Sequence, residues 1–139
     1  SGKMGKSEGE GNAIFLGEEP ESIRKKVMRA VTDSGPTEPF QAKAEPIANL
    51  FTLMSLVSEP ETLAFYEESY NACSIRYGDM KKQLAEDMIR FTAPIRERIK
   101  DIHANEDYLK KVMKSGGEKA RESASATLKD VREIIVFMH

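Results

Sequence analysis

The residues best suited to chemistry lie at the start of the chain. Lys3 and Lys6 flank Gly5, and Ser7 follows directly, so two ammonium groups and a hydroxyl lie within five positions. Glycines recur around them, and charged residues separate those glycines. Glycine adopts backbone conformations that other residues avoid, so this stretch is predicted to be a mobile loop. Its cations suit an anionic ligand such as phosphate.

The order Gly5-Lys6-Ser7 resembles the end of a nucleotide-binding phosphate loop, but the surroundings exclude that motif. A phosphate loop needs a buried strand before it, an earlier glycine and a helix that starts at the Lys-Ser pair. The earlier glycine would precede residue 1, and Glu8-Gly9-Glu10-Gly11 is a poor start for a helix. The basic loop must therefore belong to another class.

The elements that position this loop follow it directly. Residues 13–16 are predicted to form a short strand or extended segment, and Pro20 with Glu21 suits the first turn of a helix. Apolar residues recur along that helix at four-residue spacing: Ile23, Val27 and Val31. It also carries four basic residues: Arg24, Lys25, Lys26 and Arg29. Residues 32–46, which contain a glycine and three prolines, are predicted to be a long connection.

Beyond Pro46 the pattern is helical throughout. One helix is predicted after Pro46, and the next is predicted to start at a capping box formed by Ser58 and Glu61. The first of these two helices has an apolar face over three turns: Ile47, Leu50, Phe51, Met54 and Val57. The predicted fold is all-α, a small helical bundle preceded by a flexible loop and a short extended segment.

The second half of the chain is predicted to form three more helices. A long amphipathic helix runs from Met80 to Ile102 with a kink at Pro94, and its apolar seam includes Met88 and Phe91. A shorter helix covers 105–113 with Asn105 as its cap. A last helix is predicted to start at a second capping box, Ser115 with Glu118.

Composition limits the partners and the compartment. A formal net charge of −2, from 21 basic and 23 acidic residues, excludes a uniformly basic nucleic-acid binder but permits a local basic patch. The single cysteine, Cys73, has no partner for an internal disulfide and is predicted to be a small buried side chain. No run of apolar residues could span a bilayer, so no membrane is expected and a cytoplasmic location is predicted. No group of His, Cys, Asp and Glu has the spacing of a metal site, and His103 is predicted to be exposed or to cap a helix.

The loop and the helices together resemble a known enzyme family. The string Lys3-Met4-Gly5-Lys6-Ser7 matches four of five positions of the lysine-methionine-serine-lysine-serine loop of class I aminoacyl-tRNA synthetases. Later segments, in order and correctly spaced, are similar to the tryptophanyl-tRNA synthetases in particular: Arg29–Ser34, Ile47–Leu50, Tyr77–Lys81 and Gly117–Arg121 with the apolar positions behind it. The chain therefore resembles the C-terminal part of such an enzyme.

This resemblance implies a chemistry for the loop. In the family, the tryptophan carboxylate attacks the α-phosphate of ATP, and pyrophosphate leaves. By resemblance, residues 3–7 contact ATP, and Lys3 and Lys6 stabilise the charge that grows on the leaving pyrophosphate, with Mg²⁺ bridging phosphate oxygens and Ser7 assisting. Met4 belongs to the same ATP-binding string. Gly5 stands where the family has serine, so one hydroxyl donor is missing.

The resemblance also implies that the helices recognise the anticodon of the tRNA for tryptophan. Unpaired bases are recognised by hydrogen bonding and stacking, and basic residues bind the phosphates. Candidates for such contacts are Arg76, Tyr77, Lys81, Lys82, Lys110, Lys111 and Lys114. The implied division is 1–18 for the loop and short strand, 19–45 for a basic linking helix and connection, and 46–139 for the anticodon-binding domain. Asp33 is a candidate to support the join.

Further expectations come from the same resemblance. The full-length ligase would be a homodimer with its tryptophan pocket outside this chain, and these residues alone would be inactive. Two alternatives remain open. The first is a tyrosyl-tRNA synthetase, which has a related fold and loop, and the second is a helical interaction module without nucleotide chemistry.

Overall fold

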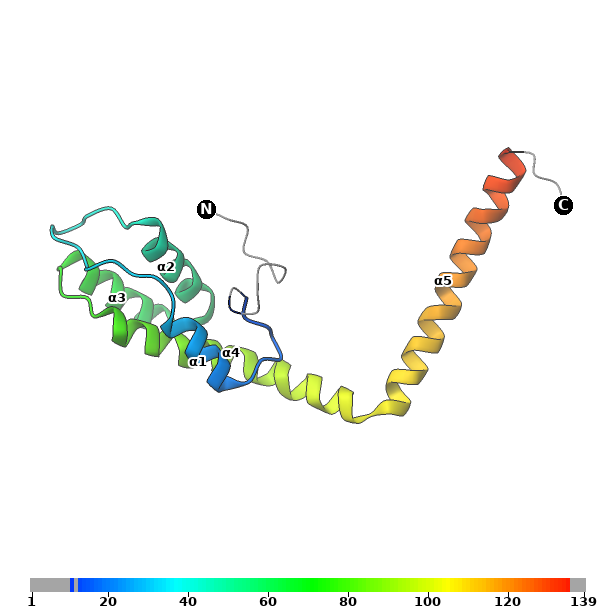
Figure 1. Cartoon of the computed structure of the whole chain (residues 1–139), viewed down its shortest axis with the longest axis horizontal. Coiled ribbons are helices and arrows are strands. Elements are labelled where there is room, and N and C mark those ends of the chain that lie inside the picture. Colours follow the sequence, from blue (N-terminus) through cyan, green and yellow to red (C-terminus); the bar gives the residue numbers. More distant parts are fainter. Residues whose placement is uncertain (1–10, 12, 136–139) are drawn as a thin grey trace. The chain divides into compact units, whose positions relative to one another are not determined.

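The computed structural model describes Gly11 and residues 13–135 of the 139-residue chain (Figure 1). Within those ranges the regular elements are five α-helices, and no strand occurs. The described residues belong to two compact units, Ser1–Glu97 and Arg98–His139. The prediction of an all-helical fold is confirmed, whereas the proposed division at residues 18 and 45 stays a prediction.

The first unit begins with a short irregular segment and a helix. Residues 13–15 have no regular secondary structure and 16–17 form a turn, so the strand alternative is wrong. Helix α1, Pro20–Met28, starts with proline in its first turn and Glu21 beside its positive end, as the sequence predicts. It buries Ile23 and Val27. The third member of the predicted stripe, Val31, lies beyond the helix and is 72% exposed.

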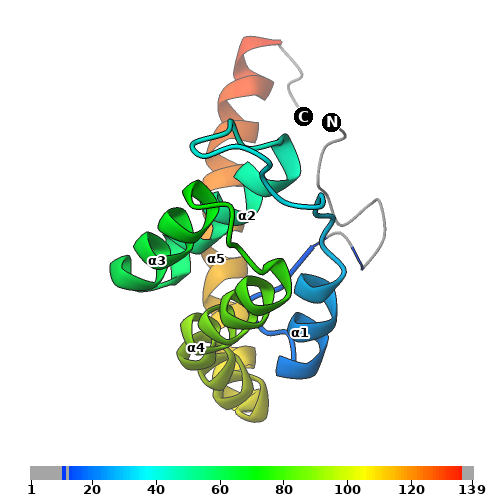
Figure 2. The same cartoon turned by 90° about the vertical axis from the view of Figure 1, so that its left-hand side faces the viewer.

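Three more helices complete this unit. They are α2, Glu45–Val57, α3, Pro60–Asn71, and α4, Tyr77–Ala104. Figure 2 looks nearly along α4 and shows α1 alongside it. The core contains side chains from all four helices: Ile23, Val27, Ile47, Leu50, Phe51, Met54, Tyr66, Tyr70, Met80, Leu84 and Ala85. The core residues of α1 and α2 and Met80 on α4 lie on the predicted apolar faces, whereas Ala85 lies outside the predicted seam of α4.

The predicted capping box at the start of α3 is wrong. Ser58 ends α2, and its hydroxyl is buried without a hydrogen-bond partner, while Glu59 precedes the first turn of α3 without a capping bond. Proline at position 60 explains the shift. Its fixed φ suits the first helical residue and its missing N–H costs nothing there, so the helix begins at Pro60.

Two side chains predicted to be buried are exposed instead. Phe91 is 51% exposed, although Met80 on the same seam is fully buried and Met88 packs partly against the core. Cys73 lies in the turn after α3 with a φ of 54° and is exposed. A turn residue at positive φ is outside the helix periodicity, which explains why its neighbours do not predict its burial.

The second unit consists of the end of α4 and helix α5, Glu106–Ile134. Asn105 caps α5 as predicted, because its side-chain oxygen accepts a hydrogen bond from the Tyr108 amide at 3.1 Å. The predicted break at Ser115 is wrong, since α5 continues through Gly116 and Gly117. Two glycines weaken a helix but do not end it when no proline follows. His103 is exposed, in agreement with the sequence.

Candidate functional site

The basic loop itself, with Lys3, Met4, Gly5, Lys6 and Ser7, lies outside the described residues. What the structure describes is the segment that follows it, from Ala13 to α1. This segment joins the loop to α1 along the chain.

Lys26 on α1 holds this segment. Its ammonium donates a hydrogen bond to the backbone oxygen of Ala13 at 2.7 Å and lies 2.5 Å from a carboxylate oxygen of Glu18. The same ammonium lies 5.3 Å from the centre of the Phe15 ring, which is within range of a cation–π contact. The side chains of Lys26 and Glu18 are 14% and 9% exposed. A largely buried ion pair therefore fixes the turn before α1.

Glu18 closes the same turn from the other side. Its carboxylate accepts a hydrogen bond from the backbone amide of Phe15 at 2.9 Å and another from the hydroxyl of Ser22. Burial by itself would raise the pKa of Glu18, but the bonds from Lys26, Ser22 and the Phe15 amide outweigh it and lower the pKa. The carboxylate is therefore charged at neutral pH.

An open pocket of about 520 Å³ lies beside this turn. Lys25 on α1 and Arg29, which directly follows α1, contribute cations to its wall, and Glu18 contributes an anion. The other residues of its lining are Gly11, Phe15, Gly17, Ser22 and Lys26. The pocket is thus next to the loop in sequence and basic on its α1 side.

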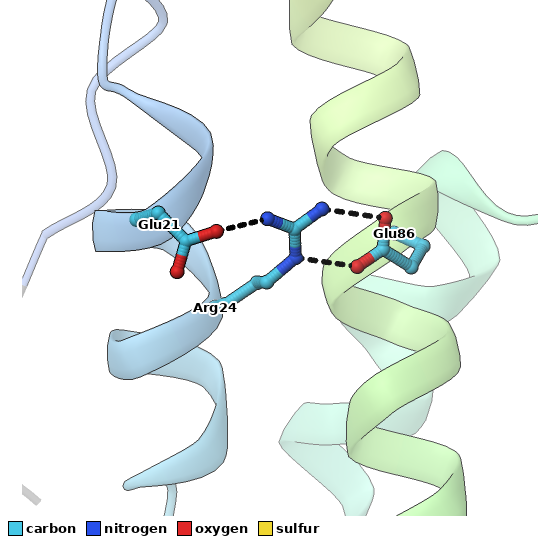
Figure 3. A network of polar contacts seen from close by, with 3 residues as sticks. All are labelled: Glu21, Arg24 and Glu86. Atoms are coloured by element: carbon cyan, nitrogen blue, oxygen red, sulfur yellow. Dashed lines mark hydrogen bonds and ion pairs between the residues drawn. The ribbon is translucent and has the colours of Figure 1, made fainter.

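A second ion pair joins α1 to α4 (Figure 3). Arg24 donates from Nε and Nη2 to the two carboxylate oxygens of Glu86, at 2.6 and 3.0 Å, and from Nη1 to Glu21 at 2.5 Å. The hydrogen bonds that Glu86 accepts from Arg24 lower the pKa of Glu86, and the bonds that Arg24 donates to Glu86 and to Glu21 raise the pKa of Arg24. Two parallel bonds of this kind fix orientation as well as distance.

The predicted RNA contacts on α4 and directly before it differ in what they touch. Arg76 and Lys82 are exposed, and Lys82 lies 3.7 Å from Asp79. Lys81 is only 8% exposed, and its ammonium donates to the backbone oxygen of Ala30 at 2.6 Å. Lys81 is therefore directed at the connection after α1.

Tyr77, the remaining candidate on α4, faces the same connection. Burial, together with the nearby carboxylate of Asp33, raises the pKa of its hydroxyl. Lys81 also donates to the Thr32 hydroxyl at 3.2 Å, whereas the Tyr77 hydroxyl is buried without a hydrogen-bond partner. The carboxylate of Asp33 accepts a hydrogen bond from the Gly35 amide at 2.8 Å, and its support of a join stays a prediction.

The other three candidates, Lys110, Lys111 and Lys114, lie on α5 in the second unit and are exposed. Lys110 forms an ion pair with Glu106, one turn earlier, at 3.2 Å. Such exposed pairs contribute little to stability and leave the cation accessible to another partner. The candidates thus belong to two units.

Neither a membrane helix nor a metal centre was found in the part of the chain that the structure describes. No described helix is long and apolar enough to cross a bilayer. Nor do the described residues bring together three or more His, Cys, Asp or Glu side chains that could hold a metal ion.

Comparison with known proteins identifies the family. The family model of the class I tRNA synthetases for tryptophan and tyrosine matches residues 1–93. The chain belongs to this family. The match includes the basic loop, α1, α2, α3 and most of α4, so Lys26, Arg24 and Glu86 all lie within the matched region.

Individual relatives extend the similarity beyond the family match. The tryptophan–tRNA ligase of Porphyromonas gingivalis is 56% identical over 137 residues, which cover 99% of this chain and 41% of that protein. The ligase of Helicobacter pylori strain 26695 is 42% identical over 96% of the chain and 40% of its own length. Tryptophan–tRNA ligase 1 of Streptomyces coelicolor is 38% identical over 96% of the chain and 39% of its own length. The chain spans about two fifths of the length of these relatives.

Sequence reasoning missed most of the residues that hold α1. Each of the four is charged and has one charged neighbour, so each looks like a solvated helix position in the sequence: Arg24, Lys26, Glu86 and Arg96. Their partners are distant in sequence or belong to the backbone, as with Arg96, whose Nη1 donates to the Glu18 oxygen at 3.3 Å. The one available signal was the placement of Lys81 and Arg96 on the apolar side of α4, where a lone cation needs a partner.

Proposed function

We propose that this chain is part of a tryptophan–tRNA ligase, in which it supplies the loop that binds the ATP phosphates and helices that bind tRNA. The observation that carries the proposal is the 56% identity to the Porphyromonas gingivalis tryptophan–tRNA ligase over 99% of the chain. Ordered identity over the loop and every helix is more specific than the loop string alone. The full-length ligase would use ATP, tryptophan and tRNA as substrates.

The proposed first step transfers the adenylyl group. A carboxylate oxygen of tryptophan attacks the α-phosphorus of ATP, the bond from that phosphorus to the bridging oxygen breaks, and its electron pair leaves with pyrophosphate. Lys3 and Lys6 would stabilise this developing charge more than they stabilise bound ATP, which raises the rate of the step. Ser7 and the loop amides would donate further hydrogen bonds. Mg²⁺ would enter with ATP as part of the substrate.

The amino acid is proposed to be tryptophan instead of tyrosine. The family model covers both specificities, but each relative reported above is a tryptophan–tRNA ligase. The tyrosyl alternative predicts ATP–pyrophosphate exchange that depends on tyrosine. Exchange by the full-length enzyme with each amino acid in turn distinguishes the two specificities.

The helices are proposed to bind the anticodon region of the tRNA. Five of the candidates have exposed cations suited to RNA phosphates: Arg76 directly before α4, Lys82 on α4, and Lys110, Lys111 and Lys114 on α5. Tyr77 and Lys81 were predicted to bind RNA too, but the hydrogen bonds from Lys81 to Ala30 and Thr32 and the buried hydroxyl of Tyr77 favour a structural role for both. A homodimeric enzyme that acts in the cytoplasm completes the proposal.

Replacing Lys6 tests the loop. In the full-length enzyme, Lys6→Ala should lower tryptophan-dependent ATP–pyrophosphate exchange by about two orders of magnitude or more, as removal of a preorganised charge donor does elsewhere. Binding of tryptophan should persist, because its pocket is proposed to lie outside these residues. Lys119→Ala, an exposed lysine on α5, is the matched control and should leave exchange unchanged. Near-normal exchange by Lys6→Ala would favour the interaction-module alternative and overturn the assigned role.

A further inference from the structure

Helix α4 binds α1 and its flanking segments in three places. At the C-terminal end of α1, Lys81 donates to the Ala30 backbone oxygen at 2.6 Å and to the Thr32 hydroxyl at 3.2 Å. In the middle of α1, Glu86 accepts the two parallel hydrogen bonds from Arg24 (Figure 3). The first contact fixes the C-terminal end of α1 on α4, and the second fixes the rotation of α1 about its own axis.

The third place is the turn before α1. Arg96, which is 7% exposed, donates from Nη1 to the backbone oxygen of Glu18 at 3.3 Å. Within that turn, Lys26 binds both Glu18 and the backbone oxygen of Ala13. A continuous series of polar contacts therefore extends from α4 to Ala13, six residues after Ser7.

We propose that Lys81 and the Arg24–Glu86 pair are positioning residues for adenylate formation, because they hold α1 on α4 and so set where the chain enters the loop with Lys3 and Lys6. The inference rests on the proposed function of that loop. Preorganised cations act only within a fraction of an ångström of their working positions, so movement of α1 affects them. The inference also gives Lys81 a role other than RNA binding.

A charge-swap series in the full-length enzyme tests the Arg24–Glu86 pair. Arg24→Glu and Glu86→Arg each place two like charges together, and each should lower kcat for tryptophan-dependent exchange about tenfold or more. The KM for tryptophan should change little. The double variant Arg24→Glu/Glu86→Arg should restore most of kcat. Glu97→Arg, an exposed position farther along α4, is the matched control and should keep normal kcat.

A variant could lose activity because it unfolds or because its loop is misplaced. To distinguish the two causes, the number of tryptophan-binding sites is measured for each variant, and kcat is expressed per site. An unstable variant has fewer such sites but an unchanged kcat per site, whereas a mispositioned loop lowers kcat per site. Normal kcat per site in both single variants would overturn the positioning role of the pair. A double variant as slow as the singles would overturn it too.

Lys81→Met separates positioning from RNA contact, since exchange is measured without tRNA. The variant keeps the apolar stem and removes the ammonium that holds Ala30 and Thr32. Lower kcat per site in exchange supports positioning, and Lys81→Arg should recover part of it. Normal exchange with weaker tRNA charging would instead make Lys81 an RNA contact and overturn the inference.

The Lys6→Ala variant is measured in parallel to separate the two proposals. If Lys6→Ala is slow while the Arg24, Glu86 and Lys81 variants are normal, only the positioning role fails. If Lys6→Ala is normal, both the proposed function of the loop and the positioning role fail.

Discussion

Glu18 provides a residue-scale prediction because its charge is stabilised only in the folded state. Its pKa is lowered below the ordinary value of 4.5, so its contribution to stability is present above about pH 4.5 and is lost as the pH falls through the lowered pKa. Glu18→Gln keeps the shape but leaves the Lys26 ammonium without its anion. We expect the free energy of unfolding at pH 7 to fall by about 1–3 kcal/mol.

The pH dependence is the specific part of this prediction. Urea unfolding of the wild type and Glu18→Gln at several pH values between about 3 and 7 should give a difference that shrinks as the pH falls below 4.5. Glu122→Gln, at an exposed position on α5, should follow the wild type at every pH. A difference that is constant across this range would mean that packing, and not the charge of Glu18, stabilises the turn.

Individual polar residues were the least predictable part of the candidate site. The loop residues and the exposed cations could be named from the sequence, because their types and order carry a family pattern. The partners of Arg24 and Lys81 could not, since Glu86 is 62 residues from Arg24 and Ala30 is 51 from Lys81. A pairing between helices depends on the packing of both, and that packing is not encoded in the local pattern of either.

Elements were predicted better than their ends. The buried residues of α1 and α2 and Met80 at the start of α4 follow from apolar spacing, which is a property of each helix alone. Farther along α4 the buried residues include Thr92 and Arg96, which apolar spacing does not predict. The start of α3 was missed because Pro60 outweighs the capping preference of Ser58, and the break at Ser115 was wrong because α5 tolerates its two glycines. Helix ends depend on small competing energies, each about 1 kcal/mol.

The same two glycines provide an element-scale prediction. A Cβ built at Gly116 or Gly117 meets no atom within 4 Å, and both lie in the interior of α5. Alanine at each position should therefore stabilise the helix by about 0.5–1 kcal/mol. Far-UV circular dichroism of Gly116→Ala/Gly117→Ala should show a higher midpoint for thermal unfolding of α5.

Gly35 is the matched contrast for these substitutions. It also has open space around its Cβ position, but its φ is +100°, where a side chain is strained. Gly35→Ala should lower the stability of the chain, in contrast to the substitutions in α5. Equal effects of alanine at all three glycines would show that helix propensity is not what limits α5.

At the scale of the whole molecule, the proposed tRNA binding must rely on local charge, because the net charge of the chain is only −2. The exposed candidates belong to both units, with Lys82 in the first and Lys111 in the second. If each binds a phosphate, Lys82→Ala and Lys111→Ala should each lower kcat/KM for tRNA charging about three- to tenfold in the full-length enzyme. Contacts in separate units should combine independently, so the double variant should show the product of the two losses.

Two further measurements determine whether these losses arise from phosphate contacts. Each contact releases counterions from the RNA, so removing one should weaken the salt dependence of tRNA binding by about one unit of slope on a log–log plot. Tryptophan-dependent exchange should stay normal in both variants, because no RNA takes part in it. A loss of charging with an unchanged salt slope would place these lysines outside the RNA interface, and lower exchange would connect them to the loop instead.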